Sequence, residues 1–390
     1  MQETDAIPPF DTHVCLVSQE AAANLLPAME PTLEPKHVVL VASPEMKGKA
    51  DHLGQALKES LPSVSIEMVE MTTAYDLTVM LEELFNLFDR LKNQGRKAVV
   101  NVTGGTKPMA IAALRSAECA DFPCFYLELD RNVVHFLTDE HAIVHLSYAQ
   151  KPKPYLLAYG FRLQKTPPSA LPFTDKLKAL AERLVKTPSF RSAYPSINAL
   201  AAQASKDNSL SVSVQQALSA GAEALLDEFE RCGLLAVHGK QIRFASEEAR
   251  YFVNGGWLEE LTAAVARATF PNSKVVANAQ IEQLVKQKTR SGEKIVRNEL
   301  DVLFWANDNL CVIECKTSNL KDQGKSQNVI YKLSSFEPRL GKRLVPILVS
   351  YLPLDDYAIS RARSDGIHVI AGDDLKRLSE RLKHFSGGHA

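Results

Sequence analysis

The first third of the chain alternates short apolar runs with longer segments of helical spacing. Runs rich in Val, Ile and Leu predict strands, and apolar positions that recur every three to four residues predict helices. The predicted strands are 13–17, 37–42, 64–69, 97–102 and 125–129, and the predicted helices between them are 46–60, 75–92 and 108–120. Short apolar strands separated by helices predict a parallel sheet that is covered on both faces.

The middle of the chain has a different pattern. Residues 150–170 are rich in proline and lysine, which predicts a linker. Helical spacing near 176–186, 196–204 and 214–232 precedes the segment 233–244, whose His-Gly-Lys turn predicts a small β-hairpin. Three helices and a hairpin resemble a winged-helix module, which can bind DNA through a helix. Since the segment has no dense basic helix face, a spacer or dimerisation role is favoured.

Two apolar runs in the last third flank the Asn-Asp-Asn turn at 307–309, a pattern that predicts a β-hairpin. A turn centred between 307 and 308 places Asp301 opposite Glu314. Side chains alternate along a strand, so Lys316 shares the face of Glu314 while the other face is core. Like charges directly opposite each other are destabilising. The facing carboxylates therefore predict a bound cation.

The alternative is a hairpin edge with solvated charges. The same face continues toward the turn with Leu303, Trp305, Leu310 and Val312, which argues against a solvated surface. Acidic groups on an apolar face usually have a partner.

Composition limits the classes of protein. The 390 residues are 45% hydrophobic and 23% charged, an ordinary globular mixture for two or three domains. The predicted divisions are 1–150, 151–250 and 251–390. The net charge is −1, so the whole chain has no bulk attraction to nucleic acid. Residues 251–390 carry 20 Lys and Arg against 16 Asp and Glu, a net +4 that leaves −5 for residues 1–250.

Cysteine usage and the absence of targeting segments predict a cytoplasmic protein. The six cysteines form no C-x-x-C pair, and three lie in apolar runs, which is typical of reduced core residues. The start of the chain has neither a basic region nor an apolar region of a signal peptide. No apolar run approaches 18 residues, which excludes a membrane span.

The loop 101–108, Asn-Val-Thr-Gly-Gly-Thr-Lys-Pro, follows a predicted strand and opens a helix. Gly104 and Gly105 permit close approach of the backbone, and Thr106 can cap the helix. Backbone N–H groups at a helix start, beside Lys107, predict a phosphate cradle. The loop does not match the Walker A pattern, so ATP hydrolysis is not implied. The alternative is a tight turn without a ligand.

Three segments of the first third resemble the CARF domain of CRISPR-accessory proteins. They are Val-Ser-Gln at 17–19, Asn-Leu-Leu-Pro at 24–27 and Asn-Val-Thr-Gly-Gly-Thr-Lys at 101–107. The resemblance implies a sensor of cyclic oligoadenylate in which two protomers form a twofold pocket for one ring, commonly cyclic tetra-adenylate. The residues implied to line this pocket are Ser18, Gln19, Thr103, Gly104, Gly105, Thr106 and Lys107.

The spacing D-x12-E-x-K at Asp301, Glu314 and Lys316 resembles the core of PD-(D/E)xK nucleases. In that family the acidic residues bind a divalent metal, and the lysine assists the attacking water. Glu259, in a predicted helix 255–269, resembles the helix glutamate that many of these nucleases add to the metal site. Its alternative is an exposed helix-start carboxylate favoured by the helix dipole. Lys332 and Gln327, in a predicted helix 323–337, are further candidates to face the site.

Together these segments resemble the CRISPR-associated family that joins a CARF sensor to a restriction-type nuclease. The resemblance implies an α/β fold with a Rossmann-like CARF domain, a winged-helix-like connector and a restriction-endonuclease-like domain. It implies a homodimer that, on binding the ring, cleaves single-stranded DNA, supercoiled DNA or RNA with Mn²⁺ or Mg²⁺ in type III CRISPR antiviral defence. Two alternatives stay open, a non-catalytic regulator that binds DNA in response to a ligand and a ring nuclease that degrades cyclic oligoadenylate.

Overall fold

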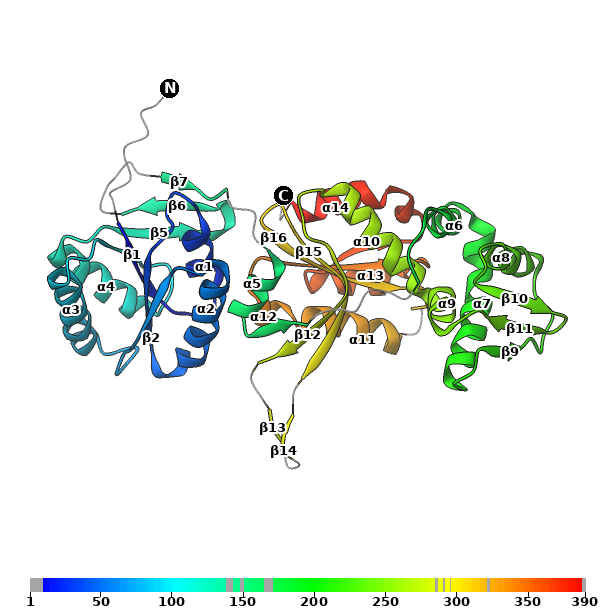
Figure 1. The fold of residues 1–390 in the computed structure, drawn as a ribbon, viewed down its shortest axis with the longest axis horizontal. Coiled ribbons are helices and arrows are strands. Elements are labelled where there is room, and N and C mark those ends of the chain that lie inside the picture. Colours follow the sequence, from blue (N-terminus) through cyan, green and yellow to red (C-terminus); the bar gives the residue numbers. More distant parts are fainter. Residues whose placement is uncertain are drawn as a thin grey trace, which may run out of the picture. The chain divides into compact units, whose positions relative to one another are not determined.

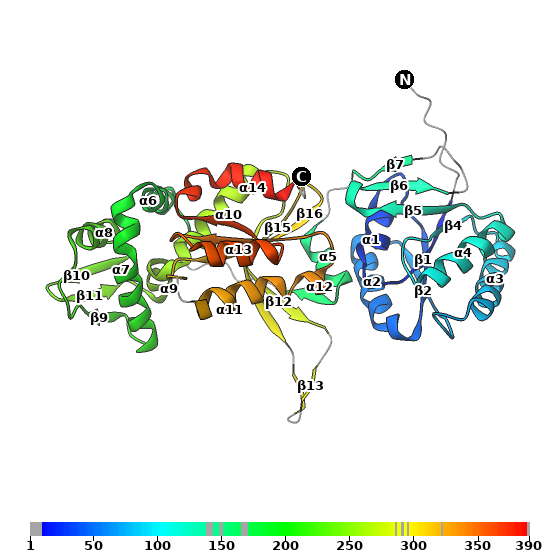
Figure 2. The ribbon, with the colours of Figure 1, turned by 180° about the vertical axis from the view of Figure 1, so that it is seen from behind.

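The computed structural model, drawn in Figures 1 and 2, describes residues 10–137, 143–147, 151–164, 171–284, 287–289, 292–294, 296–320 and 323–387. The chain forms two compact units. Unit 1 contains the described parts of Met1–Leu163, Glu282–Arg297 and Pro338–Arg343. Unit 2 contains those of Gln164–Ile281, Asn298–Glu337 and Leu344–Ala390. None of the described helices combines the length and the apolar character that a membrane crossing requires.

Unit 1 is built on a sheet whose order is β3-β2-β1-β4-β5-β6-β7. The first five strands of this order are parallel, as the apolar runs predict, and β6 and β7 add an antiparallel edge. The strands are β1 (Thr12–Leu16), β2 (His37–Ala42), β3 (Ser65–Glu70), β4 (Ala98–Asn101), β5 (Cys124–Glu128), β6 (Val133–Phe136) and β7 (Ile143–His145).

Helices cover both faces of this sheet (Figure 1). Helices α3 (Leu77–Asn93) and α4 (Lys107–Ala120) share a core with the strand residues Val14 and Val39. Helix α2 (Lys47–Ser60) covers the opposite face, and α1 (Ala22–Met29) precedes it in the chain. The predicted doubly covered parallel sheet is confirmed.

The linker prediction at 150–170 is wrong for the part that the structure describes. Residues Pro152–Ala158 form α5, and Phe161–Leu163 form β8. Proline at the first helical position is compatible with a helix, and Tyr155 and Leu156 are fully buried, so apolar burial outweighs the proline-rich composition. Residues 150 and 165–170 lie outside the described residues.

The predicted helices and hairpin of the connector are present in unit 2. They are α6 (Asp175–Lys186), α7 (Pro188–Lys206) and α8 (Ala220–Arg231), with a small sheet of order β10 (Leu235–His238), β11 (Gln241–Phe244) and β9 (Ser211–Ser213). This helical module does not have a core of its own. One cluster of buried apolar residues extends from α6, α7 and α8 into the strands that follow.

Those strands belong to a mixed sheet in which β18, β17, β16, β15 and β12 lie side by side. The strands are β12 (Val276–Gln283), β15 (Arg297–Ala306), β16 (Asn309–Lys316), β17 (Leu344–Ser350) and β18 (His368–Ala371), and β13 (Gln287–Thr289) and β14 (Gly292–Lys294) form a separate ribbon. The helices of this part of the chain are α9 (Glu247–Tyr251), α10 (Trp257–Thr269), α11 (Gln323–Ser334), α12 (Glu337–Leu340), α13 (Asp356–Ser364) and α14 (Leu378–Ser386), with a 3-10 turn at Gly372–Arg377.

The β15–β16 hairpin has the predicted register. Val302 pairs with Ile313 and Ala306 pairs with Asn309, so a turn at 307–308 joins the strands as expected. Asn307 and Asp308 both have positive φ, at 47° and 64°. Two consecutive residues with positive φ are the geometry of a tight hairpin turn, which Asn and Asp tolerate.

Candidate functional site

The acidic pair of the hairpin lies at the end of the strand ladder. The Asp301 side chain accepts a hydrogen bond from the backbone N–H of Cys315 at 2.7 Å. A side-chain oxygen of one strand is thus the acceptor for a backbone N–H of the other. Asp301 is 7% exposed and Glu314 is 3% exposed. The alternative of a solvated hairpin edge is therefore wrong, because the carboxylates are buried.

Two lysines hold the Glu314 carboxylate. Lys316 Nζ lies 2.6 Å from one oxygen, and Lys332 Nζ of α11 lies 2.5 Å from the other. The prediction that Lys332 faces the site is confirmed. Gln327, on the same helix, instead donates to the Tyr357 hydroxyl of α13 at 3.3 Å.

Glu259 approaches the pair from helix α10. Its side chain accepts a hydrogen bond from the Tyr251 hydroxyl at 2.5 Å. Burial and the charge of Asp301 raise the pKa of Glu259 to about 8. Burial and the charge of Glu314 raise the pKa of Asp301 to about 6. Three carboxyl groups thus share one electrostatic environment, and Glu259 is not a freely solvated helix-start residue.

The same carboxylates stabilise the charged form of Lys316. Burial opposes its charged form, but the carboxylates of Glu314 and Asp301 together outweigh this effect and raise the pKa of Lys316. It therefore stays a cation, able to donate hydrogen bonds rather than to accept a proton.

These carboxylates suit a divalent cation by chemistry. Carboxylate oxygens are the ligands that Mg²⁺ and Mn²⁺ favour. Added positive charge would also offset the burial and the neighbouring negative charge that raise the pKa of Asp301 and of Glu259. Within the described ranges, however, no three His, Cys, Asp or Glu side chains form a ready metal-ligand group. Lysines contact both oxygens of Glu314, so a cation would compete with them for this carboxylate.

A kink positions Glu259. Between α9 and α10 the chain forms a π-helix, Phe252–Gly256, in which Gly255 has φ 135°. A Cβ at Gly255 would lie 2.4 Å from Thr317 Oγ1, and a Cβ at Gly256 would lie 2.4 Å from the Tyr251 ring. Both glycines are needed for close packing, and π-bulges are frequent at functional sites. In the sequence, the Gly255-Gly256 pair was the feature that could have indicated this kink. No feature of the sequence indicated that Tyr251 contacts Glu259, eight positions away.

The two loops predicted to bind a ligand meet in unit 1. Strands β1 and β4 are parallel neighbours, with Cys15 beside Asn101, so their carboxyl ends lie at one edge of the sheet. Gly104 packs against β1, because a Cβ added to it would lie 2.0 Å from the Leu16 carbonyl oxygen and 3.4 Å from Ser18 Oγ. The structure therefore brings Ser18 to the Gly104–Gly105 turn, at the edge where parallel sheets bind ligands.

Buried asparagines hold the second loop. Asn101 donates to Asn24 Oδ1 at 2.8 Å, and Asn24 donates to the Leu16 carbonyl at 2.8 Å. Asn101 also accepts from the Thr103 hydroxyl at 2.6 Å, and that hydroxyl accepts from the N–H of Leu127 at 2.8 Å. The hydroxyl of Thr103 therefore has a role in fixing the loop.

The start of α4 is capped as predicted. Thr106 accepts from the N–H of Met109 at 3.3 Å and donates to the Ala74 carbonyl at 2.6 Å. Lys107, the first residue of the helix, is exposed, as is Gln19 on the neighbouring loop. Among the predicted ligand contacts, these two long polar side chains are the exposed ones, whereas the others are partly buried or, for Gly104, buried.

Sequence reasoning did not identify Glu20, which follows Gln19. Within unit 1 its carboxylate accepts from the Tyr159 hydroxyl and from the N–H of Lys342, the latter at 3.0 Å. Burial raises the pKa of Glu20. The end of the first loop is thereby attached to the segment Pro338–Arg343 of the same unit.

Two family models match the chain over these sites. The Card1 CARF domain matches residues 12–151, and the Card1-like endonuclease domain matches residues 246–387. The chain belongs to the CARF nuclease family. The first match contains both loops of the unit 1 edge, and the second contains Glu259, the acidic hairpin and Lys332.

Three solved structures resemble the chain over nearly its whole length. Protein VC1899 from Vibrio cholerae has a TM-score of 0.85 and 25% identity, covering 97% of this chain and 99% of its own. Can2 from Sulfobacillus thermosulfidooxidans, solved with cyclic tetra-adenylate, has a TM-score of 0.75 and 25% identity, covering 97% of both chains. A type III CRISPR defence DNA nuclease activated by cyclic oligoadenylate shares the fold, with a TM-score of 0.57 and 15% identity over 96% of this chain and 52% of its own. No curated protein sequence matches the chain.

Proposed function

We propose that this CARF nuclease hydrolyses phosphodiester bonds of DNA or RNA with Mn²⁺ or Mg²⁺ after binding cyclic oligoadenylate, in type III CRISPR antiviral defence. The observation that carries the proposal is the buried pair Asp301 and Glu314 with Lys316 beside it. Burying several ionised groups together is unfavourable, and titratable groups with shifted pKa values cluster at functional sites.

The acidic side chains and the lysine have different roles in the proposed reaction. A divalent cation held by Asp301, Glu314 and Glu259 would polarise the phosphate and lower the pKa of a water molecule. The hydrogen bond from Cys315 fixes the orientation of Asp301, as partners of metal ligands commonly do. Lys316, kept charged by its neighbours, would orient the attacking water or stabilise charge that develops on the phosphate.

In unit 1, the edge of the sheet where the loops after β1 and β4 meet is suited to binding a cyclic oligoadenylate. The N-terminus of α4 and the exposed Lys107 present positive charge, and Gly104 and Gly105 permit close approach of a ligand. Cyclic tetra-adenylate is the first candidate, because a relative that is similar over 97% of both chains is solved with it.

The surface of α3 and α4 supports a homodimer. Phe85 is 52% exposed and Ile111 is 47% exposed, and a cavity of about 300 Å³ lined by Leu81, Phe85 and Cys119 lies on this surface. Ile111 is one helical turn beyond Lys107. A second copy that covered this apolar surface would therefore bring a second ligand loop close to the first, as a twofold pocket requires.

A groove between α11 and α13 is suited to binding the bases of a single-stranded substrate. It has a volume of about 440 Å³ and is lined by Tyr331 and Tyr357, with Gln327 and Arg361. Tyr331 is 76% exposed and Tyr357 is 48% exposed. Exposed aromatic rings stack on unpaired bases, and α11 also supplies Lys332 to Glu314.

The test combines purified protein with plasmid, single-stranded DNA and RNA, with Mn²⁺ or EDTA, and with or without cyclic tetra-adenylate. We expect cleavage that requires both Mn²⁺ and the ring, and that is lost in Glu314→Ala while ring binding persists. Lys107→Ala should lose ring binding and retain Mn²⁺ binding. Absence of cleavage in every combination, or full activity of Glu314→Ala or Lys316→Ala, would contradict the proposal.

Two further measurements separate the alternatives. A ligand-responsive regulator has no need to bind Mn²⁺ at Asp301, so metal titration of Asp301→Ala against the wild type distinguishes it. Following the ring during incubation shows whether the protein also degrades its activator.

A further inference from the structure

One face of helix α7 contacts the chain around the candidate metal centre. Arg191, Tyr194 and Asn198 are spaced by three and four residues, which places them on one side of the helix. Each makes a polar contact with a segment beyond residue 250 of unit 2. The helical module is thereby attached to the π-helix and to the 3-10 turn along about two helical turns.

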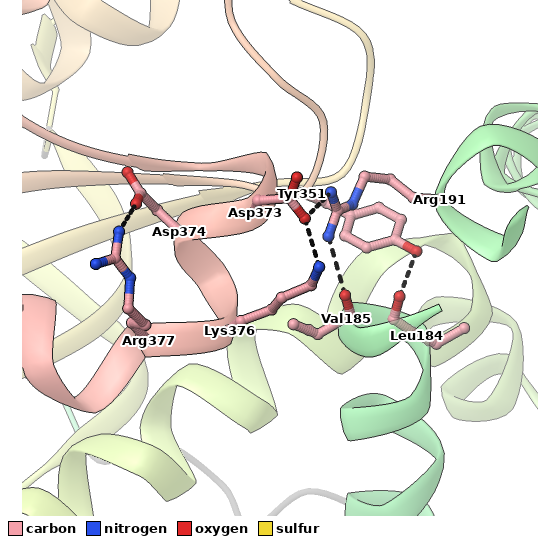
Figure 3. Close-up of polar contacts among 8 residues, drawn as sticks. All are labelled: Leu184, Val185, Arg191, Tyr351, Asp373, Asp374, Lys376 and Arg377. Carbon is pink, nitrogen blue, oxygen red and sulfur yellow. Dashed lines mark hydrogen bonds and ion pairs between the residues drawn. The ribbon is translucent and has the colours of Figure 1, made fainter. Parts of the chain in front are cut away.

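Arg191 anchors the start of the helix (Figure 3). Its guanidinium donates to Asp373 at 3.0 Å and to the Val185 carbonyl at 2.9 Å, and lies 5.7 Å from the centre of the Tyr351 ring. The Tyr351 hydroxyl donates to the Leu184 carbonyl at 2.8 Å. Figure 3 shows the hydrogen bonds of Arg191 with Asp373 and Val185, and that of Tyr351 with Leu184.

Tyr194 supports the π-helix. Its hydroxyl donates to the Val253 carbonyl at 2.7 Å and accepts from Trp257 Nε1 at 2.9 Å. The rings of Tyr194, Trp257 and Tyr351 pack edge to face, and all three side chains are fully buried. Because a π-bulge interrupts the regular helical hydrogen bonds, its carbonyl groups need partners of this kind.

Asn198 contacts both segments that carry the polar groups of the candidate metal centre. Its amide donates to the Asn254 carbonyl in the π-helix at 2.6 Å and contacts Thr317 Oγ1 at 3.4 Å. Thr317 directly follows Lys316 at the end of β16, and the π-helix leads directly into the turn that carries Glu259. One side chain of α7 therefore touches both segments that present the polar groups.

We propose that Tyr194 and Asn198 are positioning residues that set the distance between Glu259 and the end of β16. The inference rests on the proposed function, because it assigns these residues to the same metal centre. It gives the helical module a role in assembling the nuclease site, in place of reading DNA. Partners that orient metal ligands commonly contribute 10- to 100-fold to metal affinity or activity.

The experiment measures Mn²⁺ affinity by calorimetry, and kcat and KM for cleavage, in the full-length protein saturated with cyclic tetra-adenylate. Asn198→Ala removes the amide, and Tyr194→Phe removes a single hydroxyl while keeping the buried ring. Ser196→Ala is the matched control, because Ser196 lies on the exposed side of the same helix. Thermal unfolding and ring binding report whether each variant is folded.

For both variants we expect Mn²⁺ affinity and kcat to fall about tenfold, with KM for nucleic acid, ring affinity and the control unchanged. Wild-type affinity for Mn²⁺ in a folded Tyr194→Phe or Asn198→Ala protein would overturn the inference and leave the proposed function intact. A wild-type protein that binds no Mn²⁺ would overturn both. Should Asn198→Ala fail to fold, the result for Tyr194→Phe decides.

Discussion

Lys332 Nζ lies 2.5 Å from Glu314 Oε2, and this contact brings helix α11 into the candidate nuclease centre. Since Lys316 occupies the other oxygen at 2.6 Å, two ammonium groups neutralise one buried carboxylate. The two lysines differ in their expected roles. Lys316 belongs to the strand that carries the acidic pair, whereas Lys332 comes from a helix.

We expect Lys332→Met to tighten Mn²⁺ binding. The substitution frees an oxygen of Glu314 and removes a positive charge from the site, which for a partly exposed pair corresponds to about tenfold, or ~1.4 kcal/mol. Calorimetry measures the affinity, and Lys325→Met on the exposed side of α11 is the control. Weaker binding in Lys332→Met would show that the lysine orients the carboxylate for the metal.

Metal affinity should rise with pH between about 6 and 8. The pKa of Asp301 is raised to about 6 and that of Glu259 to about 8, so both bind protons that a cation must displace. As the pH rises through these values the carboxylates ionise and affinity increases. Titrations in buffers of different ionisation enthalpy count the protons released. In Glu259→Gln the component near pH 8 should disappear, and its persistence would assign that proton elsewhere.

Gly104→Ala should destabilise unit 1 and abolish ring binding. The added Cβ would lie 2.0 Å from the Leu16 carbonyl oxygen, so the loop must move away from β1. Gly48→Ala is the control, because its added Cβ would meet no described atom within 4 Å. Thermal unfolding and ring binding measure the effect, for which we expect a loss on the order of 1–3 kcal/mol from overpacking. A Gly104→Ala protein of wild-type stability would contradict the close packing of this loop.

Tyr331→Ala should raise KM for a single-stranded substrate with little change in kcat. Stacking of a base on an aromatic ring contributes about 1–3 kcal/mol, so we expect an increase of about tenfold. Tyr331→Phe keeps the ring and should retain the wild-type KM. Steady-state cleavage of a short labelled strand gives both constants. If the phenylalanine variant is as impaired as the alanine variant, the hydroxyl rather than stacking would account for the effect.

The sequence by itself determined the two strands of the hairpin and their register. Strand and helix periodicities are local, and the Asn-Asp turn specifies which residues face each other, so Asp301, Glu314 and Lys316 could be identified as a group. The Gly-Gly turn at 104–105 likewise identified the unit 1 loop, because only a few residue types adopt its geometry.

The tertiary structure decided which distant side chains contact these sites, including which of the candidates Lys332 and Gln327 reaches Glu314. Lys332 reaches Glu314 because α11 packs against β17, the parallel neighbour of β16. Tyr251 reaches Glu259 because a π-helix turns the chain between them. Asn198 meets Thr317 because the helical module shares a core with the nuclease sheet. Such contacts depend on how amphipathic faces pack together, and periodicity identifies a buried face without identifying the surface that covers it.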